Sequence, residues 1–322
     1  MRQRFASQYY IDGILMGDRL ILSRAITLVE SRLPADGELA QMVLLGVLSM
    51  TGKAIRVGIT GVPGVGKSTF IETFGTYLTE KGHQLAVLAV DPTSQRSGGS
   101  LLGDKTRMDT LSMNPRAYIR PTPAGDSLGG VGHRTRETVL LCEAAGFDVV
   151  LIETVGVGQS ETLVHGMVDF FLLLMLAGAG DELQGMKRGI MELADALAIT
   201  KADGNNRDAA QRARLEYQNA LHLFPPTGTG WFPPVLTCSA LTNQGITDLW
   251  AMILEHRNLT TQNGHHDQQR QEQQLTWFRT YLRQRLEHQF FAQPGMKARL
   301  SELEERVKKG ELLPVQAVER LF

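Results

Sequence analysis

A glycine-rich segment with the pattern of a phosphate-binding loop is the feature that most constrains this chain. It follows the apolar stretch 55–60, precedes a helical pattern, and reads Gly61-Val62-Pro63-Gly64-Val65-Gly66-Lys67-Ser68-Thr69. The glycines let backbone N–H groups converge on phosphate oxygens, and the N-terminus of the next helix adds partial positive charge. We predict that Lys67 reaches the β- and γ-phosphates, that Ser68 binds Mg²⁺, and that Thr69 lies nearer the α-phosphate.

One apolar stretch comes just before this loop, and further apolar stretches alternate with helical patterns after it. Continuous apolar runs of this length are typical of strands that are covered on both faces. We expect strands at 55–60, 85–90, 117–120, 148–153, 170–176, 196–200 and 235–238. The alternation predicts an α/β fold of the P-loop NTPase class, with a mostly parallel central sheet flanked by helices.

Helical patterns extend the chain at both ends of this nucleotide-binding region. We expect an N-terminal helical extension at 1–53, a nucleotide-binding domain at 54–256 and a C-terminal helical arm at 257–322. The polar, glutamine-rich stretch 258–274 is interpreted as a linker that leads into a helix. Beyond it, apolar residues recur at helical spacing and form one stripe, which packs in a core or in an interface between subunits: Leu275, Phe278, Leu282, Leu286 and Phe290.

Charge and composition exclude several classes of protein. The 33 Lys+Arg residues balance 34 Asp+Glu residues, which argues against a generic nucleic-acid binder. The two cysteines, Cys142 and Cys238, are too few for a disulfide scaffold and argue against a zinc site. The apolar run 170–177 falls far short of the ~20 residues that span a bilayer, and we recognise no signal peptide. We therefore expect a cytoplasmic protein without a membrane partner.

Acidic residues after two predicted strands are candidates for a magnesium site. Asp91 follows the strand at 85–90, Asp104 lies in the glycine-rich segment beyond it, and Glu153 ends the strand at 148–153. Carboxyl ends of parallel strands face the ligand, so these carboxylates could hold Mg²⁺ directly or through water. Glu153 is followed at the nucleotide-switch spacing by Gly156, whose N–H could bond the γ-phosphate. Lys67, Glu153 and Gly156 are thus the predicted catalytic set.

The residue after Gly156 bears on the rate of hydrolysis. Small GTPases place a water-orienting Gln there, whereas this chain has Val157, and Gln159 is out of register. We predict slow intrinsic hydrolysis that a partner accelerates.

Two later segments predict guanine recognition, with GTP and GDP as the bound nucleotides. Thr200-Lys201-Ala202-Asp203 resembles the Asn-Lys-x-Asp motif of GTPases, and Ser239-Ala240-Leu241 follows the last predicted strand. The Asp203 carboxylate can accept from guanine N1–H and the 2-amino group together, Lys201 would lie along the base, and a backbone N–H of 239–241 would meet O6. Thr200 in place of Asn is expected to weaken bracing of the loop but to leave the specificity carboxylate intact.

Together these segments resemble the MeaB/ArgK-type G proteins of the SIMIBI class of P-loop proteins. The resemblance rests on the phosphate loop, on Asp91-Pro92-Thr93-Ser94, on the segment from Glu153 to Glu161, and on the segment from Gly178 to Lys187. It implies a homodimer joined through the C-terminal helices. It also implies a GTPase chaperone of adenosylcobalamin-dependent methylmalonyl-CoA mutase that gates cofactor loading and protection. In the family, the segment matching 179–187 is an additional switch that senses the partner.

Three other functions remain as alternatives. A metal-insertion GTPase of the nickel-chaperone type needs Cys/His clusters, whereas the one adjacent histidine pair is His265-His266. A protein-targeting GTPase of the signal-recognition type needs a basic, Met-rich domain that we do not see. A P-loop kinase or ATPase linked to basic amino-acid transport lacks a recognisable acceptor site. Arg134 and Arg136 could approach the phosphates in cis or lie on a solvated helix turn.

Overall fold

The computed structural model describes residues 4–31, 33–91, 108–123, 128–154, 160–178, 188–225 and 228–322. The chain divides into two compact units, Met1–Gln273 and Gln274–Phe322. Each unit is described by itself below.

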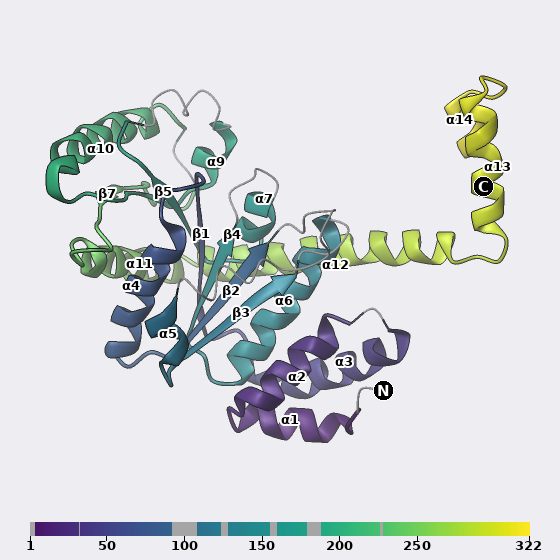
Figure 1. Cartoon of the computed structure of the whole chain (residues 1–322), viewed down its shortest axis with the longest axis horizontal. Helices are drawn as coiled ribbons and strands as arrows, with labels where there is room; N and C mark the ends of the chain where they lie inside the picture. Colours follow the sequence, from purple (N-terminus) through teal and green to yellow (C-terminus); the bar gives the residue numbers. More distant parts are fainter. Residues whose placement is uncertain are drawn as a thin grey trace. The chain divides into compact units, whose positions relative to one another are not determined.

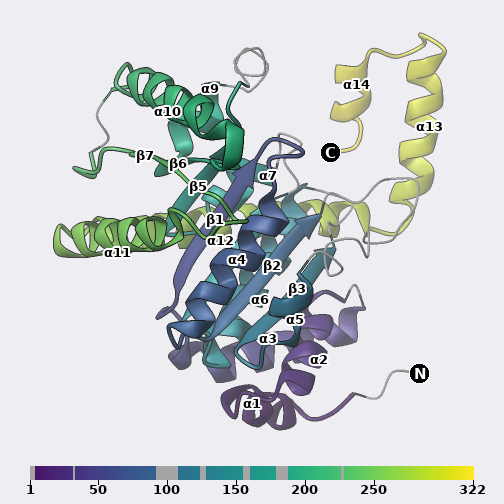
Figure 2. The same ribbon diagram turned by 60° about the vertical axis from the view of Figure 1, so that its left-hand side comes forward.

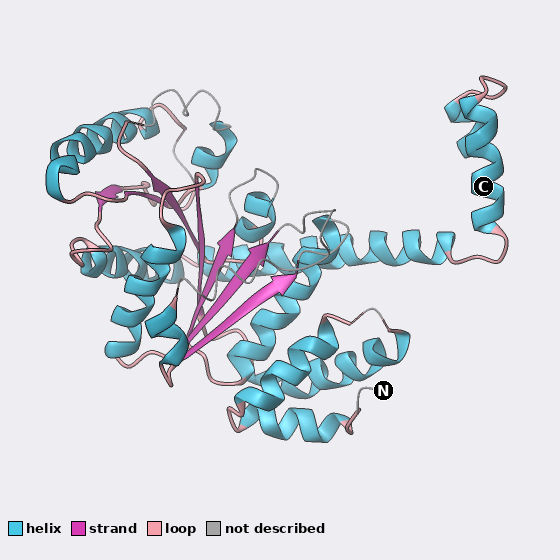
Figure 3. Ribbon diagram, in the orientation of Figure 1, coloured by secondary structure: helices cyan, strands magenta, loops and turns pink. Residues whose placement is uncertain are grey.

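A parallel seven-stranded sheet forms the centre of the first unit (Figure 3). Its strands lie in the order β3-β2-β4-β1-β5-β6-β7. Their bounds are β1 Ile55–Gly61, β2 Leu85–Asp91, β3 Ala117–Pro123, β4 Val149–Thr154, β5 Phe170–Met175, β6 Ala196–Ile199 and β7 Val235–Thr237. Every predicted strand is present, and the predicted α/β architecture with a parallel sheet is confirmed.

Helices cover both faces of this sheet, because successive strand residues point to opposite sides. In the described part of the first unit, the α-helices between the phosphate loop and α12 are α4 Lys67–Glu80, α5 Asp109–Met113, α6 Leu128–Ala144, α7 Ser160–His165, α9 Arg188–Leu193, α10 Arg207–Leu221 and α11 Ile246–Gln262. Leu85 and Val87 pack with residues of α4 and α11, whereas Ala86 and Leu88 pack with residues of α6. Figure 2 shows α4 lying against the sheet, on the face to which Leu85 and Val87 belong.

The N-terminal extension consists of helices that pack on α6. These are α1 Ser7–Leu15, α2 Arg19–Val29 and α3 Pro34–Val47, followed by a short 3-10 turn, η1 Leu48–Met50 (Figure 1). Asp18 begins α2 by accepting hydrogen bonds from the backbone N–H groups of Leu20 and Ile21 at 2.8 and 3.0 Å. Glu30 accepts from Arg120 of β3 at 2.5 Å, so the extension is also tied to the sheet edge.

The stretch 258–274, which we expected to be a linker, is helical. Helix α11 continues to Gln262, and α12 begins at His265 and runs to Phe291. Only Asn263 and Gly264 separate them, and Gly264 has a φ of +79°, the left-handed conformation that glycine adopts at helix ends. The linker prediction is wrong because a low apolar content does not prevent helix formation. Gln, Glu and Arg are good helix formers, and an exposed helix needs no apolar face.

The first turns of α12 belong to the first unit and are anchored in it by Arg270. Its guanidinium donates to both oxygens of Asp169, with Nε–Oδ1 at 2.8 Å and Nη2–Oδ2 at 2.7 Å. Asp169 precedes β5 and also accepts from the backbone N–H of Arg56 at 2.9 Å. The Nε2 amide of Gln273 adds a hydrogen bond to the Val168 carbonyl at 2.8 Å. A bidentate pair of this kind fixes the first turns of α12 against the residues that lead into β5.

The second unit contains the rest of α12 and two shorter helices, α13 Met296–Lys308 and α14 Pro314–Glu319. Leu303, Leu312 and Ala317 form its small core. Four residues of the predicted apolar stripe on α12 are exposed: Leu275 is 54% exposed, Phe278 63%, Leu282 45% and Leu286 57%. The fifth, Phe290, is half-buried and stacks on Phe322. The predicted helical extensions are present at both ends of the chain, with α1 to α3 at the N-terminus and α12 to α14 at the C-terminus. No helix in the described part of the chain is long and apolar enough to cross a membrane.

Candidate functional site

The order of the strands sorts the sequence motifs to either side of β1, from which the phosphate loop extends. On one side lie β4, which carries Glu153, and then β2, which ends in Asp91. On the other side lie β5, β6 and β7, and the last two lead into Thr200 and Ser239. Because all these strands are parallel, the motifs meet at the carboxyl edge of the sheet, where α/β proteins bind ligands.

The phosphate loop curls around the ammonium group of Lys67. Lys67 Nζ donates to the carbonyl of Gly61 at 2.8 Å and to that of Val62 at 3.3 Å, and the residue is 9% exposed. Gly66 precedes α4 with a φ of +95°, a conformation that a residue with a Cβ atom rarely adopts. The loop therefore places the lysine inside its curve at the N-terminus of α4, as an anion site of this type requires.

Ser68 and Glu153, both predicted to serve the magnesium site, come together. Ser68 Oγ donates to Glu153 Oε1 at 3.4 Å, and both residues are buried. Their proximity follows from the register of the sheet, in which Glu153 of β4 lies opposite Ile59 of β1. Hydroxyl and carboxylate oxygens are ligands that Mg²⁺ prefers, so the chemistry of this pair fits the ion.

The other predicted metal and catalytic residues are not described in full. Asp91 ends β2 beside β4, but its side chain lies outside the described residues, as do Asp104 and Gly156. Within the ranges that the structure describes, no group of three or more His, Cys, Asp or Glu side chains could hold a metal ion.

A cavity of about 210 Å³ lies between the phosphate loop and the two segments predicted to recognise the base. Its walls come from the end of the loop, the first turn of α4, and both base segments: Val65, Gly66, Thr69, Phe70, Thr200, Lys201, Asp203, Cys238, Ala240 and Leu241. Segments more than a hundred residues apart in the sequence therefore form one pocket next to the phosphate loop.

Thr200 connects segment 200–203, the first of the two segments predicted to recognise the base, with the phosphate loop. Its hydroxyl donates to the carbonyl of Val65 at 2.8 Å, and its backbone N–H donates to the carbonyl of Met175 on β5 at 2.8 Å. We expected Thr in place of Asn to weaken bracing of the loop. The structure shows how Thr braces it, through a buried hydroxyl. Lys201 Nζ adds a bond to the Gly64 carbonyl at 2.9 Å.

The carboxylate of Asp203 is held in place by Ser239. Ser239 Oγ donates to Asp203 Oδ2 at 2.5 Å and accepts from the backbone N–H of Thr242 at 3.2 Å. The backbone N–H of Ala202 donates to the carbonyl of Cys238 at 3.0 Å. These bonds join the two base segments. Burial raises the pKa of the Cys238 thiol to about 12, so this lining residue stays uncharged at neutral pH.

Other candidates from the sequence make contacts away from the cavity. Arg136 Nη2 donates to the carbonyl of Gly166 at 2.7 Å, and burial followed by the charge of Arg56 lowers its pKa to about 10. His266 faces Asp169 at 3.7 Å and Asp267 at 3.1 Å. The segment 179–187 lies outside the described residues.

One residue close to the cavity belongs to no motif. Thr73 of α4 donates a hydrogen bond to the carbonyl of Ala240, which lines the cavity. Its only sequence signal is a position one helical turn after Thr69.

Comparisons with known proteins identify the relatives of this chain. A family model described as methylmalonyl-CoA mutase-associated GTPase MeaB matches residues 22–295. A putative GTPase of Caulobacter vibrioides is 55% identical over 310 residues, which cover 96% of this chain and 94% of that protein. A mitochondrial methylmalonic aciduria type A homologue of Mus musculus is 46% identical, covering 99% and 79% of the two chains. A crystal structure described as a LAO/AO transport system kinase matches with a TM-score of 0.77 and 38% identity, covering 100% and 98%.

Proposed function

We propose, because this chain belongs to the MeaB family of methylmalonyl-CoA mutase-associated GTPases, that its GTP cycle controls an adenosylcobalamin-dependent methylmalonyl-CoA mutase. The chain is a GTPase by family. In the proposed cycle the protein associates with the mutase and gates loading and protection of the mutase cofactor. The family match over residues 22–295 is the observation that carries the proposal.

The phosphate end of the nucleotide is assigned to the phosphate loop. Residues 61–69 would surround the phosphates with backbone N–H groups, and Lys67 would offset the charge of the β- and γ-phosphates. Its position inside the loop, 2.8 Å from the Gly61 carbonyl, supports this role. Gly156 would contact the γ-phosphate through its backbone N–H.

Mg²⁺ is assigned to the oxygen ligands beside the loop. Ser68, Asp91, Asp104 and Glu153 would hold the ion directly or through water, and the contact of Ser68 with Glu153 supports this assignment. When bound, Mg²⁺ would neutralise charge that develops on the phosphates during transfer. Glu153 is 6% exposed, so its carboxylate acts where water screens charge little.

Guanine is assigned to the 210 Å³ cavity. Asp203 would accept from N1–H and the 2-amino group, and its contact with Ser239 holds the carboxylate in one orientation. A backbone N–H of 239–241 would donate to O6, and Lys201 would lie along the base.

A homodimer joined through the C-terminal helices is part of the proposal. The exposed stripe on α12, with Phe278 63% and Leu286 57% exposed, supports it. Contiguous exposed apolar side chains on one helix are typical of surfaces that are covered by a partner.

Nucleotide-dependent association is the test of the partner. The full chain would be mixed with a methylmalonyl-CoA mutase in GDP and, separately, in a non-hydrolysable GTP analogue, and the complex isolated by size exclusion. We expect a complex whose amount depends on the nucleotide. Absence of a complex with both nucleotides would refute the partner assignment and leave the GTPase assignment untouched.

A matched pair of lysine variants tests the phosphate site. Lys67→Ala is expected to abolish hydrolysis and weaken GDP binding, whereas Lys81→Ala, at the exposed far end of the same helix, should change neither. Wild-type turnover above ~1 s⁻¹ without a partner would contradict slow intrinsic hydrolysis.

One related solved structure is described as a transport system kinase, so a kinase function is retained as the alternative. A comparison of GTP and ATP affinity separates the two functions. Preference for ATP would favour the kinase, and preference for GTP favours the proposal.

A further inference from the structure

Thr73 connects the helix that begins at the phosphate loop with the segment that lines the base cavity. It lies on α4 one turn after Thr69, and its Oγ1 donates to the carbonyl of Ala240 at 3.0 Å. Ala240 lines the base cavity, so Thr73 bonds a residue of the cavity wall. The two residues that it joins are 167 positions apart in the sequence.

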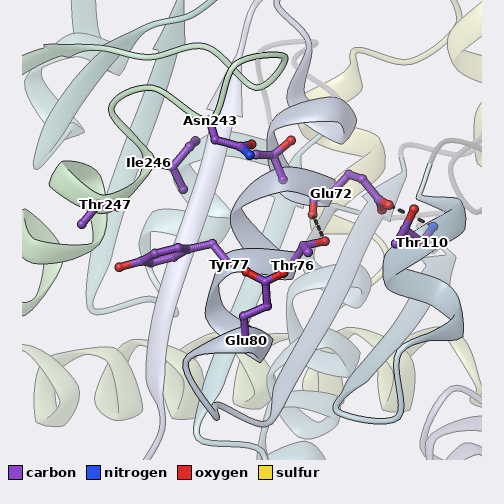
Figure 4. A pocket seen from close by; sticks show the side chains of 9 residues that line it. Glu72, Thr76, Tyr77, Glu80, Thr110, Asn243, Ile246 and Thr247 are labelled. Carbon is purple, nitrogen blue, oxygen red and sulfur yellow. Dashed lines mark hydrogen bonds between the residues drawn. The ribbon is translucent and has the colours of Figure 1, made fainter.

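The hydroxyl of Thr73 has a different kind of hydrogen-bond acceptor from the hydroxyls of Thr76 and Thr79 on the same helix. A threonine in a helix commonly bonds the carbonyl three or four residues earlier. Thr76 does so with the carbonyl of Glu72 at 2.7 Å, which Figure 4 shows, and Thr79 does so with that of Thr76 at 2.9 Å. The hydroxyl of Thr73 instead points to segment 239–241 and bonds the Ala240 carbonyl. The bond to Ala240 thus replaces a local bond that was available.

The bond determines how one peptide unit of the base segment is oriented. The carbonyl of Ala240 and the N–H of Leu241 belong to the same planar peptide, so fixing the carbonyl also fixes the direction of that N–H. The N-terminal side of this peptide is held by Ser239, whose N–H donates to the Gln244 carbonyl at 2.9 Å and whose Oγ donates to Asp203. Thr73 on α4 holds the same peptide through its bond to the Ala240 carbonyl.

Thr73 also lines a second cavity, of about 300 Å³, together with Thr76, Tyr77 and Asn243. Figure 4 shows the last three around it. The side chain of Thr73 that bonds the Ala240 carbonyl thus also borders this second cavity. Loss of its hydroxyl would leave the Ala240 carbonyl to water, which gives it no fixed orientation.

We infer that Thr73 is a positioning residue for guanine recognition: by holding the Ala240 carbonyl it fixes the backbone of segment 239–241, from which an N–H can meet guanine O6. This inference rests on the proposed assignment of guanine to the cavity. Thr73 acts through the peptide and does not itself touch the base. Its contribution should therefore appear only with a ligand whose 6-position accepts a strong hydrogen bond.

The test compares GDP with 6-thio-GDP, which keeps N1–H and the 2-amino group but replaces O6 by sulfur, a weaker acceptor. Dissociation constants for both nucleotides would be measured by calorimetry on the full chain carrying Thr73→Val, Thr73→Ser or Thr76→Val. Thr76→Val is the matched control, because Thr76 lines the same second cavity but bonds only its own helix.

Thr73→Val is expected to weaken GDP by about threefold to tenfold, the range of one net hydrogen bond, and 6-thio-GDP by less. Thr73→Ser and Thr76→Val should keep the wild-type ratio of the two constants. Equal weakening of both nucleotides by Thr73→Val, or no weakening, would overturn the inference. A wild-type protein without preference for GDP over ADP would instead refute the proposed guanine site.

Discussion

Thr200 Oγ1 donates a hydrogen bond of 2.8 Å to the backbone carbonyl of Val65, so the first residue of the base segment braces the last turn of the phosphate loop. Both residues are buried: Val65 is 0% and Thr200 5% exposed. The two ends of the proposed nucleotide site are therefore connected through a buried contact. A hydrogen bond in such a place is costly to remove, because the carbonyl left behind has no water to bond.

Replacement of Thr200 by Val tests this connection. Valine keeps the shape of the side chain and removes the hydroxyl, which leaves the Val65 carbonyl without this donor. We expect GDP to bind about fivefold to thirtyfold more weakly, which corresponds to about 1–2 kcal/mol. Thr200→Ser retains the donor and serves as the control. Equal GDP affinity of Thr200→Val and wild type, measured by calorimetry, would show that the bond does not support binding.

Asp203→Asn should change which nucleotide the protein prefers. The carboxylate is a double acceptor for guanine N1–H and the 2-amino group, whereas an amide offers one donor and one acceptor and suits xanthine. We expect GDP affinity to fall and XDP affinity to rise, measured by competition. Unchanged guanine affinity would refute the assigned role of Asp203. Asp208→Asn, on the exposed first turn of α10, is the control.

Truncation after Gln273 should give a monomer that still binds GDP. The cut removes the exposed stripe but keeps Arg270 and Gln273, which hold the start of α12 against the sheet. Sedimentation would report the mass and calorimetry the GDP affinity. A truncated chain that remains dimeric would place the interface elsewhere. A shorter chain ending at residue 262 should be less stable, because it leaves Asp169 without Arg270.

Arg270→Met should destabilise the first unit strongly. The Arg270–Asp169 pair is bidentate, and the two side chains are 13% and 7% exposed. Removing one partner of a buried pair typically costs about 3–5 kcal/mol, because a charge is left buried alone. Arg283→Met, which removes an exposed charge from the same helix, should cost less than about 0.5 kcal/mol. Urea unfolding measures both, and equal stabilities would contradict the prediction.

Acid should weaken the same pair. Burial alone would raise the pKa of Asp169, but its bonds with Arg270 and the charge of Arg56 hold it below the ordinary value of 3.8. A lowered carboxyl pKa gives stability that is present above 3.8 and is lost as the pH falls through the folded-state value. The wild-type unfolding free energy should therefore fall on acidification below pH 3.8. In Arg270→Met this part of the pH dependence should disappear. A profile identical to the wild type would show that the pair is not its source.

Short-range patterns in the sequence determined the fold class and predicted most of the proposed nucleotide site. The strand runs and the phosphate loop are recognisable within about ten residues, because they depend on backbone conformation and on burial of neighbouring positions. The pocket that joins Thr200, Asp203 and Leu241 follows from the motif order and the carboxyl ends of parallel strands.

Only the tertiary structure decided which distant residues support those motifs and where the helices end. Thr73 meets Ala240 across 167 positions, and Arg270 meets Asp169 across 101. No local pattern specifies either pair. The same holds for the stretch 258–274, whose polar composition suggested a linker although it forms the end of α11 and the start of α12. A motif is set by the conformation of a few neighbouring residues, whereas the partner of a side chain depends on which segments the packed sheet brings together.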